Sequence, residues 1–361
     1  GAEFNFETMR MELTSFSALL FNPVAQVKFV HTVAAGYVTG AVFVLAISSW
    51  YLLKGRDLGF ARRSFAIASA FGMASILSVI ILGDESGYEI GDVQKTKLAA
   101  IEAEWHTEPA PAAFTLFGLP NQAEQRTDYA VKIPYVMGII ATRSLDTEVT
   151  GIKDLIKQHE VRIRNGIKAY ALLEKLRSGE KTPENLAAFN QHKQDLGYGL
   201  LLKKYTPAVV DASEAQIKQA ALDTIPNVAT VFWSFRLMVA SGFLMLALFA
   251  CAFWASARKN EEKKRWLLKW ALYSLPLPWI AAQTGWLVAE HGRQPWSIAE
   301  VLPVHLSTST ISAADVWGSL LALLAFYSVL LVIEMYLMIK FARLGPSSLH
   351  TGRYHFEQQP A

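Results

Sequence analysis

Three side chains that can bind a metal ion occur in, or directly at the end of, three separate apolar runs of the chain: His31, Met238 and Glu290. An imidazole and a thioether together form the axial pair of a low-spin, electron-transferring haem, because the soft sulfur favours reduced iron. A lone carboxylate can bind a second iron and leave its sixth position open to a small ligand. The ordinary alternatives are that His31 caps or snorkels at a helix end, that Met238 fills a core, and that Glu290 anchors a helix at the membrane surface.

Two arginines and a tryptophan accompany these candidate ligands. Arg236 precedes Met238 by two residues, and Arg293 follows Glu290 by three residues. Each arginine can bind a haem propionate through charge-assisted hydrogen bonds. Trp286 lies one helical turn before Glu290 and shares its face of a helix. The alternative is that the arginines anchor helix ends beside an interfacial aromatic belt that includes Trp296.

The elements that must position these side chains are membrane helices. The chain has 361 residues, of which 52% are hydrophobic and only 18% are charged, whereas soluble proteins carry about a quarter charged residues. A bilayer is crossed by about 20 residues of helix, and five uncharged runs are long enough. These runs are residues 29–53, 64–83, 237–257, 270–289 and 316–333. The predicted fold is therefore an all-α polytopic membrane protein with five transmembrane helices and a partly helical polar domain.

Basic residues orient the predicted spans. The short loops after the first and third runs, and the segment after the fifth, contain many of the Lys and Arg residues, which favour the cytoplasmic side. We therefore expect an outward N-terminal segment (1–22), spans one and two (23–83), an outward domain (84–226), spans three to five (227–343) and a cytoplasmic tail (344–361). At 1.5 Å per residue, His31 then lies about 12 Å and Met238 roughly 16 Å inside the outer surface.

The predicted outward domain has little sequence signal for chemistry of its own. The segment "DVQKTKLAAIEAEW" (92–105), which includes Lys97 and Glu102, has the composition of an ordinary solvated helix. The charge-rich stretch that begins at residue 152 has helical spacing, and "TEPAPAAFTLFGLPNQ" (107–122) is typical of a linker. The single cysteine, Cys251, excludes an internal disulfide framework and a Cys-based metal site, and the net charge of +3 gives no indication of a nucleic-acid partner.

Long and unusual strings across the chain resemble one family. They are "FNFETMRMEL" (4–13), "NPVAQVKFVHTVAAGYVTGA" (22–41), "GDESGYEIGDVQKTKLAAIEAEW" (83–105), "WLVAEHGRQPW" (286–296) and "KFARLGPSSLHTGRYHFEQ" (340–358). They resemble the C-terminal portion of subunit I of the cytochrome bd quinol oxidases. The chain starts Gly1-Ala2-Glu3 without an initiator Met, and we expect it to be a piece of a longer protein.

The resemblance implies a role for each candidate residue. A low-spin b-type haem would be bound by His31 and Met238, with Arg236 close by. A high-spin b-type haem would take Glu290 as its axial ligand, with Arg293 near the propionates and Trp286 between the cofactors. The outward domain would be the long form of the family's Q-loop, in which 150–215 is the extra portion. Lys97 and Glu102 occupy the positions implicated in quinol oxidation.

The resemblance also implies a reaction and its partners. Ubiquinol or menaquinol would pass electrons through the b-type haems toward a d-type haem that reduces oxygen to water, electrogenically but without a proton pump. The complex would lie in the bacterial inner membrane with the Q-loop on the periplasmic side. The expected partners are subunit II, a small single-span accessory subunit, membrane lipid, and the N-terminal helices of subunit I that this chain lacks. Those helices hold the histidine ligand of the d-type haem.

Two other interpretations stay open from the sequence. The chain can be a truncated, non-catalytic homologue that retains haem and quinol binding. It can also be a transporter, since "LPLPW" (275–279) interrupts the fourth run as transporter helices are interrupted, although no paired broken segment accompanies it. Glu334, near the inner end of the fifth run, can serve a proton route, or can be a snorkelling or helix-pairing acid.

Overall fold

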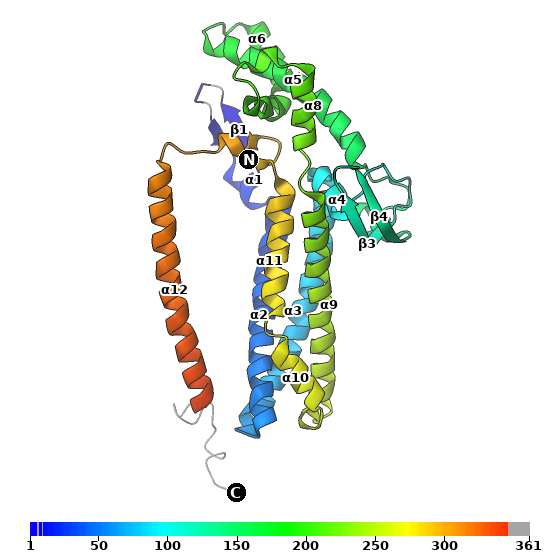
Figure 1. Cartoon of the computed structure of the whole chain (residues 1–361), viewed down its shortest axis with the longest axis vertical. Helices are drawn as coiled ribbons and strands as arrows, with labels where there is room; N and C mark the ends of the chain where they lie inside the picture. Colours follow the sequence, from blue (N-terminus) through cyan, green and yellow to red (C-terminus); the bar gives the residue numbers. More distant parts are fainter. Residues whose placement is uncertain (6, 9, 346–361) are drawn as a thin grey trace. The chain divides into compact units, whose positions relative to one another are not determined.

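The computed structural model describes residues 1–5, 7–8 and 10–345, and most of them are helical (Figure 1). The predicted cytoplasmic tail (344–361), with His350 and His355, therefore lies almost entirely outside the described residues. The main elements are β1 (Ala2–Asn5), β2 (Arg10–Leu13), α1 (Phe16–Leu20), α2 (Pro23–Lys54), α3 (Leu58–Val93), α4 (Lys95–Glu102), β3 (Phe114–Asn121), β4 (Arg126–Ile133), α5 (Ile152–Arg177), α6 (Pro183–His192), α7 (Leu196–Leu200), α8 (Glu214–Asp223), α9 (Val228–Ala257), α10 (Arg265–Tyr273), α11 (Leu277–Glu290), β5 (Trp296–Ile298), β6 (Leu302–Pro303) and α12 (Ala313–Leu344). Short 3₁₀ or π turns join several of them, among them η6 (His291–Arg293).

The helical fold class predicted from the sequence is confirmed. Among the described residues, four helical segments are long and apolar enough to cross a membrane: Pro23–Lys54, Leu58–Gly91, Glu214–Ala257 and Ala313–Leu344. They contain the first, second, third and fifth predicted runs. The strands form three two-stranded antiparallel sheets, β1–β2, β3–β4 and β5–β6.

The fourth predicted run is the exception to the count of five continuous spans. It folds as two shorter helices, α10 and α11, which are separated after Tyr273. Pro276 precedes α11 and Pro278 occupies its first turn. A proline has no backbone N–H and is tolerated only at the start of a helix, so the α10 hydrogen bonds cannot continue through this segment. The predicted count of five is therefore approximate.

Two segments differ from their sequence predictions. Helix α3 continues to Val93, well beyond the predicted end at residue 83, because no proline interrupts its polar last turns. Helix α4 begins directly afterwards, at Lys95. The predicted linker at 107–122 instead contains strand β3, whose residues Phe114 and Thr115 pair with Ile133 and Lys132 of β4. The alternating and aromatic residues of this stretch suit a strand, and the prolines limit only its ends.

Residue contacts divide the chain into two compact units. The second unit comprises residues 35–77, 242–278 and 309–361. Inside it, α3 and α9 pack closely where the Phe249 ring covers Gly72, since a Cβ at Gly72 would lie 2.0 Å from that ring. The Tyr51 hydroxyl donates a hydrogen bond of 2.5 Å to the carbonyl oxygen of Ala342 in α12. The apolar side chains along α12 are otherwise exposed.

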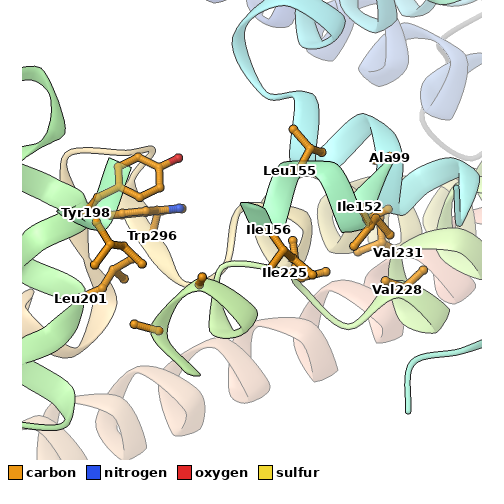
Figure 2. Close-up of a cluster of buried hydrophobic side chains, with 14 of the residues drawn as sticks. Ala99, Ile152, Leu155, Ile156, Tyr198, Leu201, Ile225, Val228, Val231 and Trp296 are labelled. Carbon is orange, nitrogen blue, oxygen red and sulfur yellow. The ribbon is translucent and has the colours of Figure 1, made fainter. Parts of the chain in front are cut away.

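The first unit comprises residues 1–34, 78–241 and 279–308, and it contains every predicted site residue. Its largest apolar cluster joins α4, α5, α7, the start of α9 and Trp296 (Figure 2). Helix α5 also packs against α6, α7 and α8, and its Gly166 lies so close to Gly199 that a Cβ at Gly166 would approach the Gly199 nitrogen to 2.3 Å. Ala99 of α4 is fully buried in the cluster. Helix α4 is therefore held by the core rather than exposed to solvent.

Candidate functional site

Helix α4 positions two buried ionisable side chains, Lys97 and Glu102. It begins after Gln94 and ends at Ala103, whose backbone is left-handed with φ of 50°. Both ionisable residues are only 3% exposed. The interpretation of this segment as an ordinary solvated helix is therefore wrong for these two residues. Burial of ionised groups is costly, so each requires a compensating partner.

Lys97 contacts the C-terminal end of α11. Its Nζ donates a hydrogen bond of 2.9 Å to the carbonyl oxygen of Ala289. Its stem lies against Gly292, where a Cβ would approach the side-chain carbons to 3.1–3.4 Å. Burial, followed by the nearby cations Lys28 and Arg293, lowers the pKa of Lys97 to about 8, against the opposing effect of Glu290. The ammonium group therefore lies in a cluster of charges beside the end of α11.

Glu102 contacts α9 and β3 instead. Its Oε2 accepts a hydrogen bond of 3.0 Å from the Thr115 amide and lies 3.6 Å from Nη2 of Arg236. Burial raises the pKa of Glu102 to about 7, although Arg236 and the amide both act to lower it. A carboxyl group with a pKa near neutrality exchanges protons readily at physiological pH.

Arg236 of α9 makes hydrogen bonds to the backbone of both α4 and β3. It donates hydrogen bonds to the carbonyl oxygens of Ile101 (2.7 Å), Phe232 (3.0 Å), Leu116 (3.2 Å) and Thr115. A guanidinium group has five N–H donors, and backbone carbonyl oxygens accept four hydrogen bonds from Arg236. The predicted role of Arg236 toward a haem propionate stays a prediction, and these contacts add a structural role that the sequence did not indicate.

His31 and Met238 each face a glycine on another helix. A Cβ at Gly83 of α3 would lie 3.4 Å from Cε1 of His31, and one at Gly285 of α11 would lie 3.0 Å from Sδ of Met238. Glycine therefore permits the close approach of both side chains. Nδ1 of His31 is buried without a hydrogen bond to any described residue, and its imidazole and the thioether are the donor types that suit a low-spin haem. His31 therefore lies beside α3, and Met238 lies beside α11.

Glu290 and Arg293 form an ion pair at the end of α11, and both side chains are about one third exposed. The Nε of Arg293 is buried and has no hydrogen-bond partner among the described residues. Trp286, one turn earlier, is 62% exposed. A partly exposed carboxylate and an arginine with an unused donor are of the chemical types that suit an iron ligand and a propionate partner. Among the described residues, no group of three His, Cys, Asp or Glu side chains surrounds a common point.

The structure therefore brings Arg236, Glu290 and Arg293 close to α4, which carries Lys97 and Glu102. Glu102 lies beside Arg236, and Lys97 lies beside the C-terminal end of α11 and the η6 turn that follows it. Sequence reasoning missed the two facing glycines, Lys28 and the Thr115 amide. Glycines in apolar helices are also common at plain helix contacts, so their sequence signal was weak. A cavity of about 480 Å³ in the polar part of the first unit, lined by residues that include Trp105, Asp223 and His305, contains none of the predicted site residues.

Comparison with known proteins gives consistent matches over nearly the whole chain. Residues 1–346 match the family described as "Cytochrome bd terminal oxidase subunit I". The chain is 48% identical over 351 residues to the cytochrome bd-II ubiquinol oxidase subunit 1 of Escherichia coli (strain K12), which covers 97% of this chain and 68% of that protein. It is 26% identical over 343 residues to the cytochrome bd ubiquinol oxidase subunit 1 of Bacillus subtilis (strain 168), which covers 95% of this chain and 61% of that protein.

A solved structure shares the fold. The bd oxidase from Geobacillus thermodenitrificans matches with a TM-score of 0.67 and 24% identity, over 96% of this chain and 64% of that one. The chain thus spans 61–68% of the length of these related chains.

Proposed function

Since the chain belongs to the family of cytochrome bd terminal oxidase subunit I, we propose that it is the haem-binding, quinol-oxidising part of a bacterial quinol:oxygen oxidoreductase. The observation that carries this proposal is the position of α4. It places a buried carboxyl group and a buried ammonium group beside the two helices that bear Met238 and Glu290. Bound haems would supply electron transfer from quinol toward oxygen, which is reduced to water.

The chain's own residues would handle the protons of the reaction. A hydroquinone loses two electrons and two protons, so its site requires a proton acceptor beside the electron acceptor. Glu102, with its pKa raised to about 7 by burial, is poised to accept a proton near neutral pH. Lys97 would hold a quinol oxygen by a hydrogen bond, because its ammonium group is fixed by the Ala289 carbonyl oxygen.

We assign the haem ligands from the matching positions and from the donor chemistry of the site. His31 and Met238 would bind a low-spin b-type haem, with Arg236 close to it. Glu290 would bind a high-spin b-type haem, with Arg293 at its propionates and Trp286 between the cofactors. The d-type haem, with its ligand, would belong to the part of the relatives' length that this chain does not span.

The same proposal gives a location and partners. The complex would lie in the bacterial inner membrane, with the Q-loop domain on the periplasmic side. Its partners would be subunit II, a small single-span accessory subunit and the further helices of subunit I, with ubiquinol or menaquinol as the reductant. The exposed apolar side chains of α12 support this assignment, because an apolar surface of this extent requires lipid or protein to cover it.

A spectrum of the purified complex that contains this chain tests the proposal. Quinol added without oxygen should reduce b-type and d-type haems, and admission of oxygen should reoxidise them with continuous oxygen uptake. Reducible b-type haems without oxygen uptake would favour the non-catalytic homologue. The absence of any haem would overturn the proposal and leave the transporter interpretation, whose one supporting feature is the break between α10 and α11.

A further inference from the structure

The loop after Glu290 returns a second carboxylate toward α4. Glu300 lies in the turn between β5 and β6, where its φ of 62° is left-handed. One carboxylate oxygen accepts a hydrogen bond of 3.1 Å from the Tyr198 hydroxyl, and the other accepts one of 2.7 Å from Nη1 of Arg162. Its backbone lies close to Gly197, where a Cβ would approach the Glu300 carbonyl oxygen to 2.1 Å. The carboxylate is therefore fixed by α5 and α7 of the polar domain.

A small cavity separates this carboxylate from the quinol-oxidising end of α4. Its volume is about 30 Å³, and Lys97 and Arg293 line it together with Tyr198 and Glu300. A water molecule requires roughly 10–15 Å³ of such space and two to four polar partners, so the cavity has room for at least one. Tyr198 packs against Trp296 (Figure 2). Trp296 also lines the cavity.

Glu300 also reaches bulk solvent. Its side chain is 42% exposed, whereas Lys97 across the cavity is only 3% exposed. Among the described residues that line the cavity, Glu300 is the one carboxylate. The ionisable groups that face or act on it are Arg162 and His159 from α5, Asp195 through Arg162, Tyr198 from α7, and Lys97 and Arg293 across the cavity.

We propose that Glu300 is the outward proton acceptor that passes protons from the quinol-oxidising side of α4 to solvent, through water held in this cavity. The inference rests on the proposed function. A hydroquinone loses two protons, and Glu102 is the proposed acceptor of one of them. As the other quinol O–H bond breaks, bound haems would take the electron and the proton passes to the cavity water. That water gives a proton to the Glu300 carboxylate, which then releases it to bulk solvent. Tyr198 and Arg162 position the carboxylate.

The test uses the assembled membrane complex with Glu300→Gln. The initial rate of haem reduction by quinol is measured by stopped flow, in H₂O and in D₂O, from pH 6 to pH 9. We expect a rate about 100-fold lower, which is the lower end of the range for a lost proton-transfer group, and a larger solvent isotope effect. Glu300→Asp should restore most of the rate. Glu214→Gln, which removes an exposed carboxylate paired with Arg164, is the matched control and should behave as wild type.

A second variant separates proton transfer from a structural role of Glu300. Ala299→Leu fills the cavity without removing the carboxylate and should slow haem reduction in the same way. A variant Glu300→Gln that unfolds at lower temperature but keeps the wild-type rate and isotope effect would overturn the proposal, as would a wild-type rate in Ala299→Leu. If quinol fails to reduce haem in the wild type, the proposed function itself fails, which is a different outcome.

Discussion

The Oε2 atom of Glu102 lies 3.6 Å from Nη2 of Arg236, and both side chains are buried. This pair connects the end of α4 to α9. At the other end of the same short helix, Lys97 donates to the carbonyl oxygen of Ala289 on α11. Two ionisable groups five residues apart thus contact the two helices that carry Met238 and Glu290, and α4 links the proposed quinol chemistry to both.

The raised pKa of Glu102 predicts a pH-dependent rate. Because burial raises this pKa from 4.5 to about 7, the carboxylate form that can accept a proton becomes dominant only above pH 7. Quinol oxidation should therefore rise with pH through about 7. Glu102→Gln should lower the rate about 100-fold and remove this rise, as measured by quinol oxidation from pH 5.5 to pH 8.5.

The pKa of Glu102 also affects stability, but in the opposite direction: as the pH rises, the rate should increase whereas the stability of the fold should decrease. A carboxyl whose pKa is higher in the folded protein than in the unfolded chain stabilises the fold at low pH, and this contribution is lost as pH rises from 4.5 to 7.

The control for the rate measurement is Glu124→Gln, which removes an exposed carboxylate paired with Arg126. An unchanged rate and pH profile in Glu102→Gln would exclude Glu102 as the proton acceptor.

The close approach of Gly285 to Met238 predicts that a substitution at Gly285 changes the midpoint potential of the low-spin haem. A Cβ at this position would lie 3.0 Å from Sδ of Met238, so Gly285→Ala should displace the thioether by a few tenths of an ångström. Weaker thioether ligation favours oxidised iron, and the midpoint potential of the low-spin haem should fall in a redox titration. Gly242→Ala in the same helix as Met238 meets no atom within 4 Å. Both substitutions replace glycine by alanine and so favour the helix by about 0.5–1 kcal/mol. A shift in midpoint potential of equal size in both variants would show that displacement of Met238 is not its cause.

The lowered pKa of His159 predicts that the polar domain loses stability in acid. Burial, followed by the nearby Arg162, lowers the pKa of His159 to about 4. Its Nδ1 lies 2.7 Å from the Thr224 hydroxyl, which itself donates to the Ala221 carbonyl oxygen and so must accept from the imidazole. The folded state therefore holds a neutral ring that the unfolded chain protonates below about pH 6.5.

Its stabilising contribution should be complete above pH 6.5 and fall by roughly 3 kcal/mol as the pH approaches 4. The free energy of unfolding of this domain, measured by urea-dependent proteolysis between pH 7.5 and pH 4.5, checks the prediction. His159→Gln should be less stable at pH 7.5 and should lose less stability on acidification. The exposed His106→Gln is the control. Equal acid dependence in wild type and His159→Gln would show that another group is responsible.

The helices and their ends were predictable from the sequence to the extent that hydropathy and proline decide them. Uncharged runs located α2, α3, α9 and α12, and the Pro276–Pro278 segment marked the break before α11. Strand β3 was missed because its prolines suggested a linker, while cross-strand pairing decides its conformation. Helix α4 appeared solvated because its charged residues are buried only by segments distant in sequence.

The site was predictable in its residue types but not in its contacts. His31, Met238 and Glu290 were recognisable as metal-capable side chains in apolar runs. The contacts of Arg236 with four carbonyl oxygens join residues up to 135 positions apart, and Lys97 and Ala289 are 192 positions apart. The cavity at Glu300 likewise depends on tertiary packing, for which a single sequence carries no local signal.

The most direct measurement is the reduced-minus-oxidised spectrum of the purified complex with His31→Ala, and separately with Met238→Leu. The control is Met245→Leu, which alters a buried methionine of the same helix as Met238. If His31 and Met238 are the axial pair, both variants lose the low-spin b-type signal while Met245→Leu retains it. A wild-type spectrum in either variant would contradict the assignment of this haem to these two side chains.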